Sequence, residues 1–279
     1  MKQKKILYPY TILISVLCIF FIAPVQCEQL IEKKIVIITA SYNNQKWYAW
    51  NLDSIFEQNY TNYTVIYIND NSSDDTGKLV ERYIEEHNQQ HRVSLINNKT
   101  RRLTMANQYD AIHSCDDNDI IMIVDGDDKL AHKNVLAYIN AVYSDPNIWL
   151  TYGQFIEYPT NVRGFCAPMP ADVVRNNSFR SYTHIPSHLR TFYARLFKKI
   201  KKEDLMYEND FIPMAPDMAA MIPMIEMARD HFAFIPVILY TYNAINIISE
   251  HRVSKELQRN MDLYIRSKPR YTPLTTLFN

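Results

Sequence analysis

Short apolar runs alternate with stretches of helical spacing along the chain from residue 33 onward. The apolar runs, each typical of a buried strand, cover residues 34–43, 64–70, 92–98, 119–128 and 148–158. Stretches with an apolar residue every three to four positions, typical of helices, cover residues 47–58, 72–87, 103–115 and 134–145. Short strands that alternate with helices predict crossover connections and a mostly parallel central sheet flanked by helices.

The second half of the chain has a less regular pattern. We expect an amphipathic helix over 188–200 and another over 217–229, with a kink or a break at Pro223. Residues 232–243 predict a strand interrupted at Pro236. Five methionines recur at spacings of three to four and indicate a core face rather than a binding groove; they are Met214, Met218, Met221, Met224 and Met227.

The N-terminus has the pattern of a targeting segment. Lys2, Lys4 and Lys5 precede an apolar stretch over residues 6–25, as in a signal peptide, and the stretch is also long enough to anchor the chain in a membrane. The positive charge before it predicts that the rest of the chain crosses the membrane. We therefore expect residues 1–27 to be a signal peptide or an N-terminal membrane anchor. The chain would then lie in the secretory pathway, in the ER or Golgi lumen, secreted, or anchored with its larger part outside the cytosol.

Composition narrows the possible function classes. Hydrophobic residues make up 47% and charged residues 22%, which is typical of a globular protein, and residues 33–279 are long enough for one large α/β domain. The 30 basic and 30 acidic residues balance, which argues against a nucleic-acid partner. With 4 glycines and neither GxGxxG nor GxxxxGK[ST], the chain has no classical dinucleotide or P-loop motif.

Cysteines and glycosylation sequons also fit an oxidising lumen. A disulfide between Cys115 and Cys166 is one possibility there. Asn-x-Ser/Thr sequons, which would make the chain a glycoprotein, start at Asn59, Asn62, Asn71, Asn98 and Asn176.

Polar residues follow three of the predicted strands at the point where each strand ends. They are residues 39–43, residues 69–70 and the Asp-Gly-Asp-Asp stretch 125–128. A polar turn alone would explain any one of them, because Asp and Gly are ordinary turn residues. In a parallel sheet, however, all three lie at one edge, where they would form a pocket. Carboxylates there would suit a divalent metal, Mn²⁺ or Mg²⁺, bound together with a diphosphate.

Several motifs together resemble glycosyltransferase family 2, whose members are nucleotide-diphosphosugar transferases of the GT-A fold. The resemblance starts with the Thr-Ala-Ser-Tyr-Asn stretch at 39–43, the "NDNSSDDT" motif at 69–76 and the DxD signature in "DGDD". It continues through "SHLRTF", "PDMAAMIPMIEMA", "FIPVILYTYN" and "ISEHRV", and so covers nearly the whole chain after the signal. In this chain Asn69 replaces the first Asp of the second motif. The resemblance implies a single Rossmann-like domain of the GT-A fold.

The resemblance also implies roles for individual residues. Those matched to donor binding are Thr39, Ser41, Tyr42, Asp70 at the nucleobase, Arg102 and, near the ribose, Asp125. Those matched to the metal are Asp127, Asp128 and His251. Asp217 matches the general base of inverting members, while Asp70, Asp74 and Asp217 could instead cap helices. His188 and Arg190 are either donor or acceptor contacts or residues of a helix face.

The implied reaction is a metal-dependent, inverting transfer of a sugar from a nucleotide-diphosphosugar to an acceptor hydroxyl. UDP is the default nucleotide, because Asp70 suits uracil, and the acceptor is a glycan, a protein or a lipid. The main alternative is a catalytically inactive GT-A-fold binding protein. A phosphotransferase of the haloacid-dehalogenase type also has a strand that ends in DxD, but there the motif follows the first strand.

Overall fold

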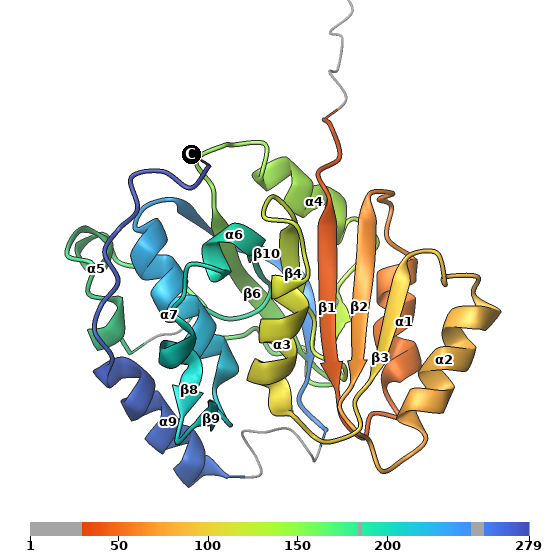
Figure 1. Ribbon diagram of the computed structural model, residues 1–279. Coiled ribbons are helices and arrows are strands. Elements are labelled where there is room, and N and C mark those ends of the chain that lie inside the picture. Colours follow the sequence, from red (N-terminus) through yellow and green to blue (C-terminus); the bar gives the residue numbers. More distant parts are fainter. Residues whose placement is uncertain (1–29, 184–185, 247–253, 279) are drawn as a thin grey trace, which may run out of the picture.

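The computed structural model describes residues 30–183, 186–246 and 254–278 (Figure 1). Its first half alternates strands and helices as expected: β1 (Ile35–Ser41), α1 (Tyr48–Phe56), β2 (Tyr63–Asn69), α2 (Thr76–Glu86), β3 (Val93–Asn97), α3 (Leu103–His113) and β4 (Ile120–Ile123). β1 pairs in parallel with both β2 and β4, and β2 pairs in parallel with β3. The register sets Ser41 beside Asn69 and Asn69 beside Asn97, so these strands end level with one another.

The second half adds strands of both directions and shorter helices. Its elements are β5 (Lys129–Leu130), α4 (Val135–Val142), β6 (Leu150–Tyr158), α5 (Ala171–Arg175), η1 (Phe179–Ser181), β7 (Arg190–Tyr193), α6 (Ala194–Phe197), η2 (Lys202–Leu205), β8 (Met206–Tyr207), β9 (Asp210–Phe211), α7 (Pro216–Ala228), β10 (Phe232–Asn243) and α9 (Lys255–Ser267). β10 pairs in parallel with β6, and the register shifts between Ile235 and Ile238, around Pro236. The expected interruption of this strand is therefore confirmed.

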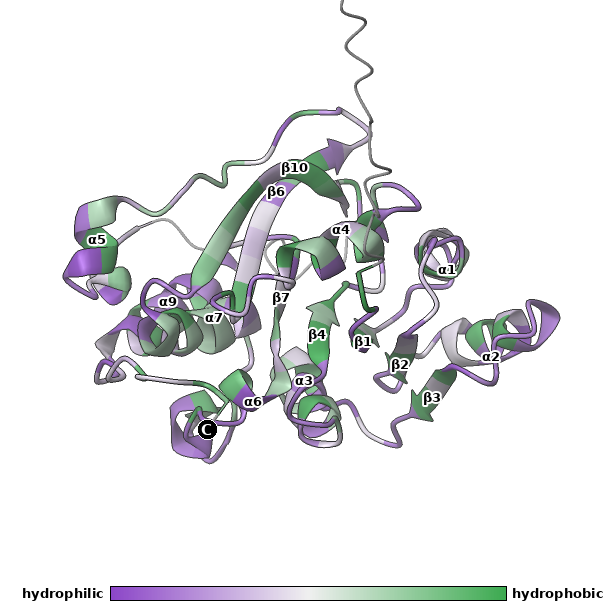
Figure 2. Cartoon of the chain, turned by 90° about the horizontal axis from the view of Figure 1, so that it is seen from above, coloured by the Kyte–Doolittle hydropathy of each residue, from purple (hydrophilic) through white to green (hydrophobic). Residues whose placement is uncertain are grey.

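Within the described part of the chain, the main sheet has eight strands in the order β3-β2-β1-β4-β7-β6-β10-β5. Seen from above, α1, α2 and α4 lie on one face of the sheet, and α3, α6 and α7 lie on the other (Figure 2). Because helices cover both faces, residues 35–38 of β1 are all buried, and the strand reads as a continuous apolar run.

The prediction of a helix over 188–200 is wrong. Residues 190–193 form β7, which lies antiparallel between β4 and β6, and only residues 194–197 are α-helical. A strand in the middle of a sheet is buried on both faces, so its apolar residues show no alternation, and a short run of this kind cannot be told from a helix by spacing. Because β7 runs antiparallel to its neighbours, its first residue, Arg190, lies beside Ile123 at the end of β4.

Helix α7 runs through Pro223 without the break that we allowed for. The five methionines expected to form a core face are all buried. A buried ion pair joins this helix to η1, because Arg180 Nε lies 2.9 Å from Glu226 Oε1. Arg180 Nη1 also donates to the Ile265 carbonyl of α9. The Tyr271 N–H also donates to Glu226, 3.0 Å away. Together these bonds hold α9 and the segment after it against α7.

Two other expectations concern cysteines and the membrane. Cys115 and Cys166 are both buried free thiols, so the disulfide considered between them is not formed; Cys115 Sγ instead contacts the Ala111 carbonyl at 3.2 Å. Among the described residues, no helix has the length and apolar character needed to cross a membrane. Residues 1–27 lie outside the described residues, so the expected division of the chain into 1–27 and 33–279 stays a prediction.

Candidate functional site

The Asp-Gly-Asp-Asp turn follows β4 at the carboxyl edge of the sheet. Asn51 on α1 fixes its backbone, because its Nδ2 donates to the carbonyls of Asp125 (3.0 Å) and Asp128 (2.8 Å). A side chain at Gly126 would not fit, since a Cβ there would lie 2.7 Å from the Cβ of Ser41. The turn is therefore pressed against the end of β1, which brings its carboxylates next to the loop after that strand.

Asp128 is the anchored carboxylate of the turn. Only 1% of its surface is exposed, and it accepts hydrogen bonds from Tyr240 Oη (2.7 Å) and from the Asn243 N–H (2.6 Å). The Tyr240 oxygen in turn accepts from the Asp125 N–H at 3.1 Å. Burial, together with the charges of Asp127 and Asp125, raises the pKa of Asp128 well above its usual range.

The other two carboxylates of the turn are half-buried and line a cavity. Asp127 accepts a hydrogen bond of 2.6 Å from Asn246 Nδ2, and burial, helped by the charge of Asp125, raises its pKa to about 6. Burial also raises the pKa of Asp125, against the opposing effect of Arg190. Ionising all three carboxylates is therefore unfavourable here unless a further positive charge is present.

β7 brings two more polar residues to this edge. His188 precedes the strand and stacks on Tyr240, with ring centroids 4.4 Å apart. Burial, and secondly the charge of Arg190, lowers the pKa of His188 well below its usual value, so its imidazole is neutral at physiological pH. Arg190 Nη2 lies 3.4 Å from Asp125 Oδ2 and 3.3 Å from His188 Nδ1. From the sequence, His188 and Arg190 were either site contacts or residues of a helix face. The antiparallel strand β7 places both at the site.

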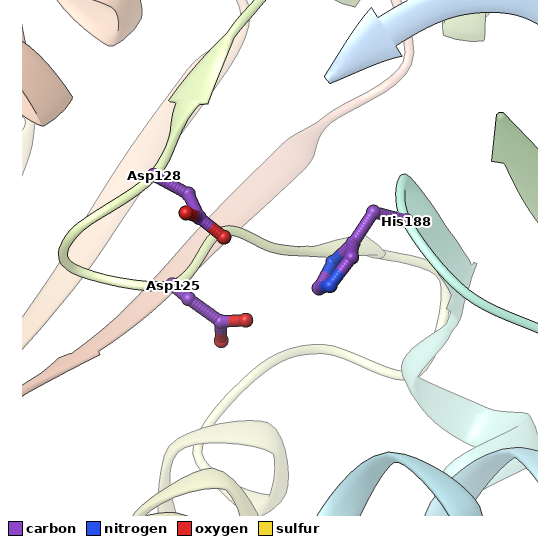
Figure 3. Close-up of side chains that lie close together, drawn as sticks. All are labelled: Asp125, Asp128 and His188. Atoms are coloured by element: carbon purple, nitrogen blue, oxygen red, sulfur yellow. The ribbon is translucent and has the colours of Figure 1, made fainter. Parts of the chain in front are cut away.

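The donor set fits a divalent cation. Asp125, Asp128 and His188 each offer a ligand atom, and these atoms lie within 4.8 Å of one another (Figure 3). Ligand distances of about 2.0–2.6 Å put atoms on opposite sides of an ion about 4–5 Å apart, which is compatible with this spacing. Among the described residues, Arg190 is the only basic side chain that forms an ion pair with a carboxylate of this cluster, so the acidic groups exceed the positive charge that faces them.

Asp217 reaches the same cavity from the first turn of α7. The N-cap position of this helix is occupied by Ala215, and no side chain caps it, so Asp217 is not the helix cap that we considered. Its Oδ2 lies 3.4 Å from Arg190 Nη1, and its side chain is 31% exposed. Arg190 therefore stands between Asp217 and Asp125, with one guanidinium nitrogen toward each.

Asp70 lies at the far end of the cavity, beyond the end of β2. Its Oδ1 accepts from Asn98 Nδ2 (2.8 Å) and from the Arg102 N–H (2.9 Å), and its Oδ2 accepts from the Leu103 N–H (2.9 Å). Asp70 thus holds the N-terminus of α3 rather than that of the helix that follows it in sequence. Asp74 fills that second role, because its Oδ1 accepts from the Thr76 N–H at 3.0 Å.

Two of the expected donor residues are not where the sequence suggested. The Thr39 side chain is fully buried and does not line the cavity, because it lies one strand repeat deeper in β1 than Ser41, which does. The Arg102 side chain faces Asp110, 2.5 Å away, and contributes only its backbone to Asp70. In this segment it is the preceding residue, Arg101, that lines the cavity, and the sequence did not predict it.

Arg101 and Tyr42 form a stacked pair at this end of the cavity. The Arg101 guanidinium carbon lies 3.8 Å from the centroid of the Tyr42 ring. Ser41 next to it is held in place, since its Oγ accepts from Tyr67 Oη (2.9 Å) and Asn44 Nδ2 (3.0 Å). Adjacent arginines in a loop cannot be distinguished from sequence spacing, which explains why the sequence pointed to Arg102 while the Arg101 side chain lines the cavity.

One cavity of about 460 Å³ joins these groups and has the size of a small-molecule site. Of the residues expected at the site, those that line it are Ser41, Tyr42, Asp70, Asp125, Asp127, Asp128 and Asp217. His251, the third expected metal ligand, lies outside the described residues, and its role stays a prediction.

Comparisons with known proteins agree with this fold. A family model described as "Glycosyl transferase family 2" matches residues 36–202, and since that is more than half of the chain, the chain belongs to glycosyl transferase family 2. No curated protein matches it significantly.

Solved structures of glycosyltransferases share its fold. S. aureus TarS 1–349 in complex with UDP-GlcNAc is 17% identical, with a TM-score of 0.58 over 79% of this chain and 61% of that one. The mannosyltransferase PcManGT from Pyrobaculum calidifontis, in complex with GDP-Man and Mn²⁺, is 20% identical, with a TM-score of 0.55 over 85% of this chain and 66% of that one. Against S. aureus TarS the chain spans 37% of that protein's chain. The expected GT-A fold is confirmed.

Proposed function

We propose that this chain transfers a sugar from a UDP-linked donor to an acceptor hydroxyl, with a divalent cation and with inversion at the anomeric carbon. The observation that carries the proposal is the single cavity that runs from Asp70 and Arg101 to the carboxylates of the 125–128 turn and to Asp217. Family membership supports the reaction class over the phosphotransferase alternative.

The Asp70 end of the cavity suits the nucleotide. Uracil presents an N–H between two carbonyl oxygens, so a carboxylate and a neighbouring cation are suitable partners for it. Asp70 and Arg101 both line this end, and the Arg101–Tyr42 stack offers a flat surface for a base or a ribose. The similar TarS structure holds UDP-GlcNAc, whereas PcManGT holds GDP-Man. We prefer UDP because Asp70 and Arg101 suit uracil.

The carboxylates of the turn would hold the cation. Asp125 and Asp128 would provide oxygen ligands, His188 would add a neutral nitrogen, and Asp127 would face the same ion from the cavity. A divalent cation bound there would supply positive charge to a donor diphosphate, the leaving group of the transfer. The similar PcManGT structure contains Mn²⁺, which supports a metal of this kind.

Asp217 would accept the proton of the acceptor hydroxyl. It is partly exposed to the cavity, and Arg190 holds its carboxylate in place. As the proton moves to Asp217, the acceptor oxygen bonds to the anomeric carbon, and the bond from that carbon to the diphosphate breaks on the opposite face. A single displacement of this kind inverts the anomeric centre and needs no bond between the sugar and the enzyme.

A screen of donor hydrolysis tests the proposal. Purified chain would be incubated with UDP-, GDP- and dTDP-linked sugars, with Mn²⁺ or with EDTA, and release of the nucleotide would be measured. Release from a UDP-sugar only when metal is present would support the proposal. Binding of a UDP-sugar without any turnover, with or without sugar acceptors, would instead favour the catalytically inactive binding protein.

We further propose that residues 1–27 direct the chain into the secretory pathway. Protease protection of a C-terminal tag in microsomes tests this, and digestion without detergent would contradict it.

Glycosylation of a chain in the secretory pathway should differ between sequons. Asn98 Nδ2 donates to both Asp70 Oδ1 and Asn107 Oδ1, each at 2.8 Å, and a glycan would replace one of those hydrogens. We expect Asn98 to stay unmodified, in contrast to the exposed Asn71.

A further inference from the structure

The order of the strands arranges the cavity along the edge of the sheet. From β2 through β1, β4, β7 and β6 to β10, the residues that line it are Asp70, Ser41, Asp125, His188, Phe155 and Tyr242. Neighbouring strands lie about 4.8 Å apart, so β6 is about 10 Å from β4, on the side away from β2. The carboxylates of the turn therefore occupy the middle of the cavity, and Phe155 and Tyr242 occupy the end opposite Asp70.

This opposite end is aromatic. The Phe155 ring is 5.6 Å from that of Phe165, at an interplanar angle of 85°, and 5.8 Å from that of Tyr242, at 65°. All three rings line the cavity, and Phe165 is 61% exposed. Ligand pockets are typically lined by aromatic side chains with a few polar groups among them, so three rings on one cavity wall indicate a binding surface.

The chain positions Phe165 through a tight reversal after β6. The Glu157 N–H donates to the Val162 carbonyl at 2.8 Å, and the Gly164 N–H donates to the Phe155 carbonyl at 2.9 Å. The Phe155 ring lies against the bare backbone of Gly164, where a Cβ would come within 2.4 Å of it. The place of Phe165 next to Phe155 is thus fixed by backbone hydrogen bonds and by the absence of a side chain at residue 164.

Polar groups lie among these rings. Glu157 lines the cavity two residues beyond Phe155, on the same side of β6, and Ser187 and Asn246 line it as well. A sugar ring has one face of C–H groups, which suits the negative face of an aromatic ring, and a rim of hydroxyls, which suits carboxylate, hydroxyl and amide groups. An alkyl chain placed here would leave Glu157 without a hydrogen-bonding partner in a site from which water is displaced.

We propose that Phe155, Phe165 and Tyr242 form the acceptor subsite and that the acceptor is a saccharide. This inference rests on the proposed function, because it takes the Asp70 end and the carboxylates as the donor side. The sugar acceptor would present its hydroxyl toward the middle of the cavity, where Asp217 lies. Among the three acceptor classes left open by the sequence, the structure thus favours a glycan over a lipid or a protein.

Binding of defined saccharides to the full chain tests the subsite. Saturation-transfer-difference NMR would be recorded with cellobiose, chitobiose, lactose and mannobiose, in the presence of UDP and Mn²⁺, and dissociation constants would be obtained by titration. Phe165→Ala should weaken the saccharide that binds by about 3- to 10-fold, and Phe165→Tyr should retain its affinity. Gly164→Ala, which displaces the Phe155 ring, should weaken it too. Val237→Ala, at a 42% exposed residue of β10 outside the cavity lining, is the matched control and should have no effect.

The dissociation constant of UDP, measured on the same samples, separates the two proposals. If UDP binds with Mn²⁺ but no saccharide binds, or if Phe165→Ala leaves saccharide affinity unchanged, the acceptor subsite is wrong and the proposed function stands. If saccharides bind at Phe165 but UDP does not bind, the subsite is supported and the donor assignment fails. Absence of both kinds of binding would overturn both proposals.

Discussion

Arg190 Nη1 lies 3.4 Å from the Asp217 carboxylate, and this contact ties the start of α7 to the strand in the middle of the sheet. The same guanidinium lies 3.4 Å from Asp125. Arg190 is therefore in contact with the proposed base and with the proposed metal site at once. Positioning of this kind lets a carboxylate keep one orientation in the cavity before the acceptor arrives.

Replacement of Asp217 by Asn should separate catalysis from binding. Asp217→Asn removes the proton acceptor and keeps the size of the side chain, so transfer should fall by about 10²–10⁴-fold while the dissociation constant of UDP changes little. The measurements are kcat with a working acceptor and calorimetry with UDP and Mn²⁺. Asp172→Asn, which also removes a carboxylate from the first turn of a helix, is the control. An unchanged kcat in Asp217→Asn would mean that the base lies elsewhere.

Tyr240 should be important for stability as well as for the site. Tyr240→Phe removes the donor to Asp128 and the acceptor of the Asp125 N–H, both in a buried region. Each buried polar group left without a partner costs about 1–3 kcal/mol, so the free energy of unfolding should fall by at least about 1 kcal/mol. Urea denaturation measures it. Tyr138→Phe, at a 36% exposed tyrosine of α4, should change it by less than about 0.5 kcal/mol. Equal stability of the two variants would contradict the assigned hydrogen bonds.

The stability of the metal-free protein should depend on pH through Asp127. Its pKa is about 6 in the folded protein against an ordinary value of 3.8, so the folded state binds this proton more tightly than the unfolded chain does. The contribution of Asp127 to folding is therefore favourable at low pH and is lost as the pH rises from about 4 through about 6. Thermal unfolding in EDTA from pH 4 to pH 7 should show a steeper loss for the wild type than for Asp127→Asn. Parallel curves for the two proteins would rule out the raised pKa.

Two neighbouring arginines should have different effects on the donor. Arg101 lines the cavity and stacks on Tyr42, whereas the Arg102 side chain pairs with Asp110 at the surface. Arg101→Ala removes the cation that would face the nucleotide and the support of the Tyr42 ring, so UDP binding should weaken by about 2- to 30-fold, the range for one guanidinium–aromatic contact. Arg102→Ala should change it by less than about twofold. The dissociation constant of UDP, measured by calorimetry for both variants, tests this prediction. A larger effect of Arg102→Ala would favour the assignment from sequence, in which Arg102 binds the donor.

The sequence predicted β1 to β4 and their helices because each strand is covered on both faces and each helix has one apolar side. It also predicted that Asp70, Asp125 and Asp217 would gather at one edge, since strand ends and a resemblance to a family are both readable from sequence. It could not predict β7. Whether a short apolar run becomes a strand between β4 and β6 depends on partners far away in sequence, and the arrival of His188 and Arg190 at the site follows from that pairing.

Side-chain direction was the other limit of the sequence analysis. Thr39 and Ser41 lie on the same side of β1, and only the depth of the cavity shows that Ser41 lines it and Thr39 does not. Asp128 carries the same charge as Asp127, yet Tyr240 and Asn243 bond both of its oxygens. Such differences arise from residues of β10, more than a hundred positions later in the chain.

Titration of the full chain with UDP, first with Mn²⁺ and then with EDTA, tests the central claim most directly. The clustered carboxylates of Asp125, Asp127 and Asp128 lead us to expect tight binding with the metal and a dissociation constant at least about tenfold higher without it. Asp127→Asn should reduce the difference between the two conditions. Equal affinity for UDP in Mn²⁺ and in EDTA would contradict a metal-dependent donor site.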